Sequence, residues 1–240
     1  MAEGWRESAD AWIAHVDRGD LNRTQLLDPV VLDLVGTGAK RVLDVGCGEG
    51  RFCRMLRSRG VQAVGIEPIP ALVETAQSRG PEIPIVRGSG ELLPFRSDAF
   101  DVVVAYLTLI DIPDFRAAIR EMARVCRPGG FLVIANCSPL NTANSSGSWI
   151  RGADDERLHW PVDDYFSERG DWAEWNGIRV VNWHRPLSAY FEVLLGSGLQ
   201  LAAYLEPKPN ERTVEEFPTM RPAQRIPYFD VSKWLKPSSA

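Results

Sequence analysis

Two acidic residues and a glycine-rich turn have the types and spacing of a binding site for a positively charged ligand. Asp44 comes two residues before the first glycine of the run GCGEG at 46–50. Glycines in such a turn permit positive φ and let a ligand approach the backbone, while a following helix presents free N–H groups. A carboxylate beside the turn disfavours a pyrophosphate and favours a ligand with cationic groups.

A second acid, Glu67, ends the next apolar segment. An acid at the end of the second strand can accept hydrogen bonds from both hydroxyls of a ribose, and dehydrogenases use one there too. The dinucleotide fingerprint GxGxxG would need a third glycine at position 51, where this chain has Arg51. The spacing here is GxGxG, which disfavours a nicotinamide dinucleotide.

The elements that must position these acids alternate between short β-branched strands and amphipathic helices, a pattern typical of a parallel sheet. We expect strands at 42–45, 62–67, 83–87, 100–105, 131–135, 199–204 and 228–234, and helices at 51–59, 70–80, 114–126 and 187–195. No crossover helix separates the two late strands, so the last one should run antiparallel to its neighbours. The predicted fold is α/β, a doubly wound seven-stranded mostly parallel sheet with an antiparallel last strand.

The length of 240 residues suits one domain of this kind. We expect four parts: a helical cap (1–40), a ligand-binding core (41–136), an insert after the fifth strand (137–186), and a C-terminal helix and strand pair (187–240). The insert exceeds an ordinary loop and holds five of the eight tryptophans. Its length and its aromatic surface predict a lid over a substrate, with a small aromatic core as the alternative.

Composition narrows the partners and the location. The net charge of −5 argues against nucleic acid, whose phosphates need clustered Lys and Arg. No run approaches the roughly 20 apolar residues of a spanning helix, and the first residues do not resemble a signal peptide. We therefore expect a cytoplasmic protein without a membrane partner. The four cysteines lack CxxC pairs, so no metal site is predicted.

Four motifs in order carry a resemblance to a known family. The segments VLDVGCGEGRF, VGIEP, GELLPFRSDAFDVVVA and RVCRPGGFLVIAN, within residues 41–136, resemble the successive motifs of the class I (Rossmann-like) methyltransferases that depend on S-adenosylmethionine (SAM). The family uses SAM as its cofactor. The resemblance implies that Gly46 and Gly48 approach the methionine part of SAM, that Asp44 orients its amino group and that Glu67 holds the ribose.

The resemblance extends the cofactor site to further residues, namely Cys47, Pro68, Ser89, Gly90, Glu91, Tyr106 and Arg23. Pro68 would flank the adenine. Relatives usually carry an Asp where this chain has Ser89, so the adenine contact is left open between Ser89 and the backbone at Gly90 and Glu91. Arg23 would pair with the SAM carboxylate or form an ordinary ion pair.

Methyl transfer from SAM depends more on alignment than on covalent help, although a hydroxyl acceptor gains from a general base. The candidate catalytic residues are His184, Tyr106 and Asp111. His184 ends the insert, with a hydrogen-bonded structural histidine as the alternative. Asp111 follows the fourth strand and could be a base or could cap the next helix. Tyr106 could orient the acceptor.

These observations predict an enzyme that transfers a methyl group from SAM to O, N or C of a small-molecule acceptor. Three alternatives stay open: a protein or RNA methyltransferase, a non-catalytic SAM-binding module, and an NAD-dependent oxidoreductase. A homodimer is also left open.

Overall fold

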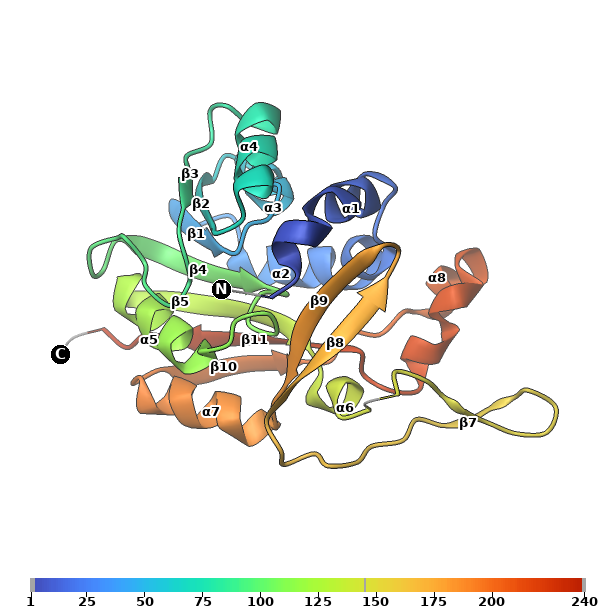
Figure 1. The fold of residues 1–240 in the computed structure, drawn as a ribbon. Helices are drawn as coiled ribbons and strands as arrows, with labels where there is room; N and C mark the ends of the chain where they lie inside the picture. The colour runs from blue at the N-terminus through green and yellow to red at the C-terminus, as the bar shows by residue number, and fades with distance from the viewer. Residues whose placement is uncertain (1–2, 145, 239–240) are drawn as a thin grey trace.

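A seven-stranded sheet forms the centre of the computed structural model, which describes residues 3–144 and 146–238 (Figure 1). Its strands are β1 (Arg41–Val45), β2 (Gln62–Glu67), β3 (Ile85–Arg87), β4 (Phe100–Tyr106), β5 (Cys126–Cys137), β10 (Gln200–Leu205) and β11 (Phe229–Leu235), in the order β10-β11-β5-β4-β1-β2-β3. Strands β1 to β5 pair in parallel, whereas β11 runs antiparallel to both β5 and β10. The predicted fold and the antiparallel last strand are confirmed.

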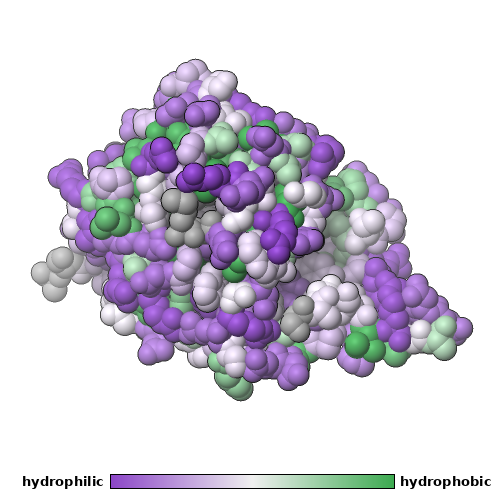
Figure 2. Space-filling model, viewed as in Figure 1, coloured by the Kyte–Doolittle hydropathy of each residue, from purple (hydrophilic) through white to green (hydrophobic). Residues whose placement is uncertain are grey.

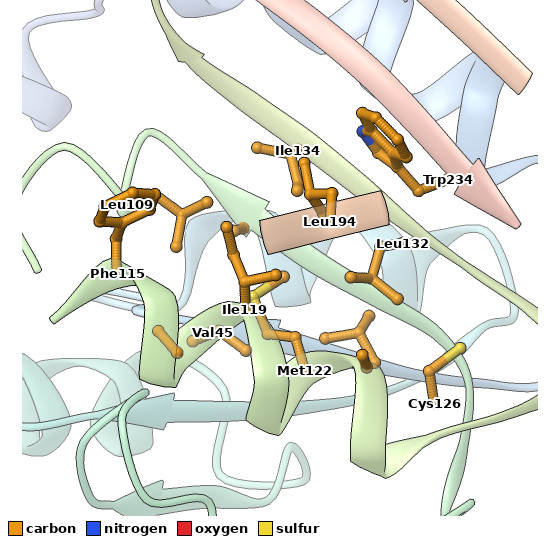
Figure 3. Close-up of a cluster of buried hydrophobic side chains, with 14 of the residues drawn as sticks. Val45, Leu109, Phe115, Ile119, Met122, Cys126, Leu132, Ile134, Leu194 and Trp234 are labelled. Carbon is orange, nitrogen blue, oxygen red and sulfur yellow. The ribbon is translucent and has the colours of Figure 1, made fainter. Parts of the chain in front are cut away.

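Helices cover both faces of the sheet, because neighbouring residues of its central strands bury their side chains on opposite sides. Leu43 packs into a core on the side of α5 (Phe115–Val125) and α7 (Leu187–Gly196), as Figure 3 shows for part of that cluster. Val42 packs into a second core with α2 (Asp28–Val35) and α3 (Arg51–Ser58). Buried parallel strands require this two-sided cover. The carboxyl ends of β1, β2 and β4 then meet at one edge, where ligands bind in such sheets.

Strand β5 begins earlier than the sequence predicts. It starts at Cys126, directly after α5, and includes the Pro128-Gly129-Gly130 turn that we expected to precede the strand. A register shift against β4 between Phe100 and Val102 accommodates the irregular start. The strand was therefore predicted too short because its bulged first residues do not show the apolar alternation of a strand.

The N-terminal cap consists of α1 (Trp5–Asp17), a π-helical turn η1 (Asn22–Leu27) and α2. Helix α1 lies against α4 (Pro70–Arg79) on one side, where Arg79 makes a two-pronged ion pair with Asp17 at 2.8 Å. On its other side α1 lies along strand β9 (Figure 1). Ser8 Oγ both donates to Arg179 O at 3.0 Å and accepts from Arg179 N at 2.9 Å.

The insert after β5 is built from a short helix and two hairpins rather than one loop. These elements are α6 (Pro139–Thr142), β6 (Ile150–Arg151) with β7 (Arg157–His159), and β8 (Arg169–Trp175) with β9 (Ile178–His184). The β6–β7 hairpin projects from the body, and the face seen in Figure 2 is mostly hydrophilic. The β8–β9 hairpin turns at Asn176-Gly177, whose positive φ values of 51° and 83° suit a tight hairpin turn.

Two shorter elements, α8 (Glu211–Glu216) and η2 (Pro218–Gln224), connect β10 to β11. None of the helices in the described part of the chain combines the length and apolar character needed to cross a membrane. Within residues 3–144 and 146–238, no three His, Cys, Asp or Glu side chains are arranged to hold a metal ion.

Candidate active site

The glycine turn between β1 and α3 forms one wall of a cavity of about 510 Å³, which we call the first cavity. Gly46 has φ +70°, and a Cβ atom there would lie 2.2 Å from Thr108 Cγ2, so only glycine fits. The backbone N–H groups of Gly46 and Cys47 both donate to Ile66 O, at 2.8 and 3.1 Å. These two bonds hold the turn against the end of β2.

Asp44 faces this cavity from β1 and is 1% exposed. Its Oδ2 accepts a hydrogen bond from Cys53 Sγ at 3.5 Å, whereas its Oδ1 has no hydrogen-bond partner in the described chain. Burial raises the pKa of Asp44 to about 7. Because buried polar atoms are rarely left unpaired, an unpartnered oxygen in a cavity wall points to a donor on a ligand.

Glu67 ends β2 on the same wall and is 5% exposed. Its Oε2 accepts from Gly48 N and its Oε1 from Ile69 N, both at 3.0 Å. Burial raises the pKa of Glu67 to about 7, and the two backbone donors act in the opposite direction. The side chain therefore ties the glycine turn to the segment that follows β2.

The residues after β3 complete the far wall of the first cavity. Ser89 Oγ donates to the Glu91 carboxylate and accepts from Glu91 N at 3.3 Å, so its hydroxyl is engaged within its own loop. All the residues that the sequence suggested for the cofactor line this one cavity: Arg23, Asp44, Gly46, Cys47, Gly48, Glu67, Pro68, Ser89, Gly90, Glu91 and Tyr106.

Tyr106 lines the first cavity, but its hydroxyl points to α2. As the last residue of β4, it donates to Asp28 Oδ1 at 2.8 Å, and Arg51 binds both oxygens of the same carboxylate. Burial raises the pKa of the Tyr106 hydroxyl. Its single proton is engaged by Asp28, so the structure does not support the expected catalytic role of Tyr106. The sequence does not single out Asp28 as a residue near the site. Its ion-pair partner is Arg51, the residue that stands where the dinucleotide fingerprint needs a glycine.

A second cavity of about 310 Å³ adjoins the first, and both are lined by Trp5, Trp12, Arg23, Leu107 and Asp111. Most residues that line the second cavity belong to α1, the loop after β4 and the β8–β9 hairpin, and the others come from η1 and the residues before it, β5 and β11. The two cavities therefore share a boundary made of aromatic, cationic and acidic side chains.

Asp111 lies at this boundary and is 9% exposed. Its Oδ1 accepts a hydrogen bond from Asn182 Nδ2 at 2.7 Å. Burial raises the pKa of Asp111 to about 7, while the hydrogen bond from Asn182 acts in the opposite direction. A carboxylate that titrates near neutral pH has the proton affinity of an effective general base.

Comparison with known proteins identifies the family. A family described as a methyltransferase domain matches residues 43–134. The phthiotriol/phenolphthiotriol dimycocerosates methyltransferase of Mycobacterium leprae is 34% identical over 188 residues, which are 72% of this chain and 67% of that protein. The chain belongs to the class I SAM-dependent methyltransferases.

Other relatives of this methyltransferase match over shorter segments. The demethylmenaquinone methyltransferase of Renibacterium salmoninarum is 31% identical over 119 residues, 49% of this chain and 50% of that protein. The matches span 40% to 50% of the length of several curated relatives. A solved SAM-dependent methyltransferase from Mesorhizobium loti superposes with a TM-score of 0.78 at 25% identity, covering 90% of this chain and 98% of the other.

The residues of the first cavity fit SAM, the cofactor of the family. The unpartnered Asp44 Oδ1 matches a ligand with an ammonium group. The absence of side chains at Gly46 and Gly48 leaves the backbone of the turn open to a ligand. The Asp44 carboxylate disfavours a pyrophosphate, whereas the open glycine turn suits either ligand.

The end of the insert holds the loop that carries Asp111 in this methyltransferase. Trp183 N donates to Ile110 O at 2.7 Å. Arg185 is 1% exposed, and its guanidinium donates to three loop carbonyl oxygens over 2.6–3.0 Å, those of Leu109, Ile112 and Pro113. The insert therefore holds this loop by hydrogen bonds to its backbone carbonyl oxygens, in addition to the bond from Asn182 to the Asp111 side chain.

His184 does not reach either cavity, contrary to its suggested role as a base. It is 1% exposed, with Nδ1 2.8 Å from Thr142 Oγ1 and Nε2 2.8 Å from Tyr165 O. Because a carbonyl oxygen only accepts, Nε2 carries the hydrogen and Nδ1 accepts from the threonine hydroxyl. Burial lowers the pKa of His184. Both nitrogens are engaged, so the structure gives His184 a structural role, as in the alternative interpretation.

The insert tryptophans occupy different environments. Trp175 lines the second cavity, whereas Trp149 and Trp160 pack against one another at 5.6 Å in a separate aromatic cluster. Trp5 and Trp12 also line the cavity, and the motifs of the sequence do not identify either as a site residue. Their spacing of seven residues places them on one face of α1, a signal that predicts a shared environment but not which one.

Proposed function

We propose that this protein transfers the methyl group of SAM to a small-molecule acceptor, with SAM in the first cavity and the acceptor in the second. The observation that carries the proposal is the shared boundary, where Asp111 faces both cavities. The second cavity, at about 310 Å³, has the size of a small-molecule site. The net charge of −5 also favours a small acceptor over nucleic acid.

The first cavity offers complementary groups for each part of the cofactor. Asp44 accepts hydrogen bonds from the ammonium group, and Glu67 accepts from the ribose hydroxyls. Arg23 has five N–H donors, of which Nε lies 3.3 Å from Asp20 Oδ2, and the others serve the cofactor carboxylate. The Arg23 guanidinium is positioned by the rings of Trp12 and Tyr106, whose centroids lie 5.0 and 4.8 Å away.

SAM supplies a methyl group activated by a sulfonium leaving group, so the protein mainly has to align the two reactants. When the acceptor atom carries a hydrogen, the Asp111 carboxylate takes that proton. Bound SAM would supply the methyl carbon, to which the lone pair of the acceptor atom bonds, and the electron pair of the broken carbon–sulfur bond would stay on sulfur. Asn182 holds Asp111 in place during this step.

Binding and turnover test the proposal in sequence. S-adenosylhomocysteine (SAH), at a hundredfold excess over its Kd, should stabilise the folded protein by about 2.7 kcal/mol and raise its melting temperature. SAH release is then measured with SAM and a panel of small hydroxyl, amine and carbon acceptors, beside protein and RNA acceptors. No SAH binding contradicts the proposal. Binding with turnover only on protein or RNA, or with no turnover at all, contradicts the small-molecule assignment.

A further inference from the structure

We infer that the second cavity selects a planar aromatic acceptor that carries a weakly acidic hydroxyl group and no fixed positive charge. The inference rests on the proposed function and narrows it to one class of acceptor. The shape, size and charge of the cavity each contribute an independent argument.

Indole rings reach the second cavity from two sides. Trp5 and Trp12 come from α1 and pack edge to face, with ring centroids 5.3 Å apart and planes at 85°. Trp175 comes from the end of β8, on the opposite hairpin. Aromatic rings in the lining of a cavity favour an aromatic ligand, because offset or edge-to-face ring pairs add to the free energy of apolar burial.

The size of the cavity limits the ring system. A protein cavity of about 150 Å³ holds one benzene molecule. The second cavity is about twice as large, at about 310 Å³, and therefore accommodates two fused rings with a small substituent.

The charged groups of the cavity disfavour a cationic acceptor. Asp20 Oδ2 already lies 3.3 Å from Arg23 Nε and 3.8 Å from His15 Nε2, so this acid is shared by two basic side chains. The Arg23 guanidinium also covers one face of Trp12. An ammonium acceptor would meet the Arg23 guanidinium. Among the described lining residues, Asp111 is the one acid besides Asp20 that could balance its charge.

Asp111 differs from Asp20 because no ion pair joins it to a basic side chain in the described chain, and its hydrogen-bond partner Asn182 is neutral. A neutral hydroxyl acceptor leaves the cavity with no added charge on binding. Transfer of its proton to Asp111 then places the proton on a buried acid for which the neutral form is favoured by burial. An aromatic hydroxyl, with a pKa of about 10 as in tyrosine, is much closer in proton affinity to Asp111 than an aliphatic alcohol is, so the transfer costs less free energy.

The test uses three matched probes on protein saturated with SAH: 2-naphthol, its saturated analogue decahydro-2-naphthol, and the cation 2-naphthylmethylammonium. Isothermal titration calorimetry first records SAH binding, whose failure would contradict the proposed function rather than this inference. We expect 2-naphthol to bind at least about tenfold more tightly than either other probe, since ring stacking and charge both contribute on that scale. Equal or tighter binding of the saturated alcohol or of the cation overturns the inference, as does no binding of 2-naphthol.

Two tryptophans of the same hairpin provide a variant and its control. Trp175→Leu should weaken 2-naphthol binding about tenfold while leaving the SAH affinity unchanged. Trp172 is 45% exposed, lies under the Arg179 guanidinium and does not line the cavity, so Trp172→Leu should leave both affinities unchanged. A loss of 2-naphthol affinity in Trp172→Leu equal to that in Trp175→Leu would place the probe outside the second cavity and overturn the inference.

Discussion

Asn182 donates its side-chain amide to Asp111 Oδ1 over 2.7 Å, although 71 residues separate the two in the chain. The donor belongs to the insert and the acceptor to the loop after β4. The insert therefore orients Asp111, the candidate base, and affects its proton affinity. Residues of the insert also line the second cavity.

Replacement of the candidate base should abolish most turnover with a hydroxyl acceptor. Asp111→Asn keeps the shape of the side chain but removes the proton acceptor, and such a loss costs about 10²–10⁴-fold in rate. The wild-type rate should rise with pH as Asp111 loses its proton and level off above about 7, whereas the variant should show no such limb. SAH release is measured against pH, beside SAH affinity, which should not change.

Asp114→Asn is the matched control for this change. Asp114 caps α5 by accepting from Ala117 N at 2.9 Å, and asparagine retains that cap. Wild-type turnover in Asp111→Asn, with the ascending limb intact, would exclude Asp111 as the base.

Loss of the Asn182 amide should move the rise of the rate with pH, the ascending limb of the pH–rate profile, to higher pH without abolishing it. The amide donates to Asp111, which favours the ionised form, so its removal in Asn182→Ala raises the pKa of Asp111. A hydrogen bond to a charged group contributes about 1.5–3 kcal/mol, equivalent to a shift of about one to two pH units. The pH–rate profile measures the shift directly. An unmoved limb would show that Asn182 does not control the proton affinity of Asp111.

Glu67→Gln should weaken SAH binding about tenfold to a hundredfold, because a charge-assisted hydrogen bond to the ribose is lost. Calorimetric titration with SAH measures the change. Glu168→Gln serves as the control, since Glu168 pairs with Arg116 on the surface and lines neither cavity. Equal affinities of Glu67→Gln and the wild type would remove Glu67 from the cofactor site.

The affinity for SAH should increase with pH between about 5 and 8. Asp44 without ligand has its pKa raised to about 7 by burial, so below that pH it holds a proton that must leave before the ammonium group binds. The affinity should therefore fall up to about tenfold per pH unit below 7. Asp44→Asn should bind more weakly at pH 8 and lose the part of this dependence that Asp44 contributes, which leaves the part contributed by Glu67, whose pKa is also raised to about 7. A wild-type affinity independent of pH would contradict an ionised Asp44 in the complex.

His184→Ala should destabilise the fold and leave the pH–rate profile unchanged. The substitution removes two buried hydrogen bonds and leaves Tyr165 O and Thr142 Oγ1 without that partner, at a cost of about 1–3 kcal/mol. Urea denaturation measures the loss in unfolding free energy. If the variant instead kept wild-type stability and lost the ascending limb, His184 would be the base after all.

Local patterns predicted most of the sheet because each strand and helix from Val42 to Val125 has its own periodicity and its own stop signal. The acids Asp44 and Glu67 could be placed because both sit at strand ends that meet at one edge. The β8–β9 hairpin carried a usable signal, Asn176-Gly177, between two short β-rich stretches. The length and tryptophan content of the insert predict a lid but do not reveal this hairpin.

The remaining parts of the site depend on contacts that no local pattern reveals. Tyr106 donates a hydrogen bond to Asp28, although the two are 78 positions apart in the sequence. Arg51 donates to the same carboxylate from 23 positions away. His184 was selected for its position in the chain, but its partners Thr142 and Tyr165 lie elsewhere in the insert and withdraw it from the cavity. The direction of each side chain, and not its position in the sequence, decides which titratable groups face the two cavities.

The bond between Ser8 and Arg179 joins residues 171 positions apart, which has a consequence for synthesis on the ribosome. The turns that carry Asp44, Glu67 and Asp111 emerge long before the β8–β9 hairpin exists. Helix α1 must therefore wait, with Trp5 and Trp12 lacking their hairpin cover, until translation passes the end of β9. Closure of contacts so distant in sequence is slow compared with local folding. The second cavity, which Phe229 of β11 also lines, is thus completed only after most of the chain has been made, and a nascent chain truncated before the β8–β9 hairpin would lack it.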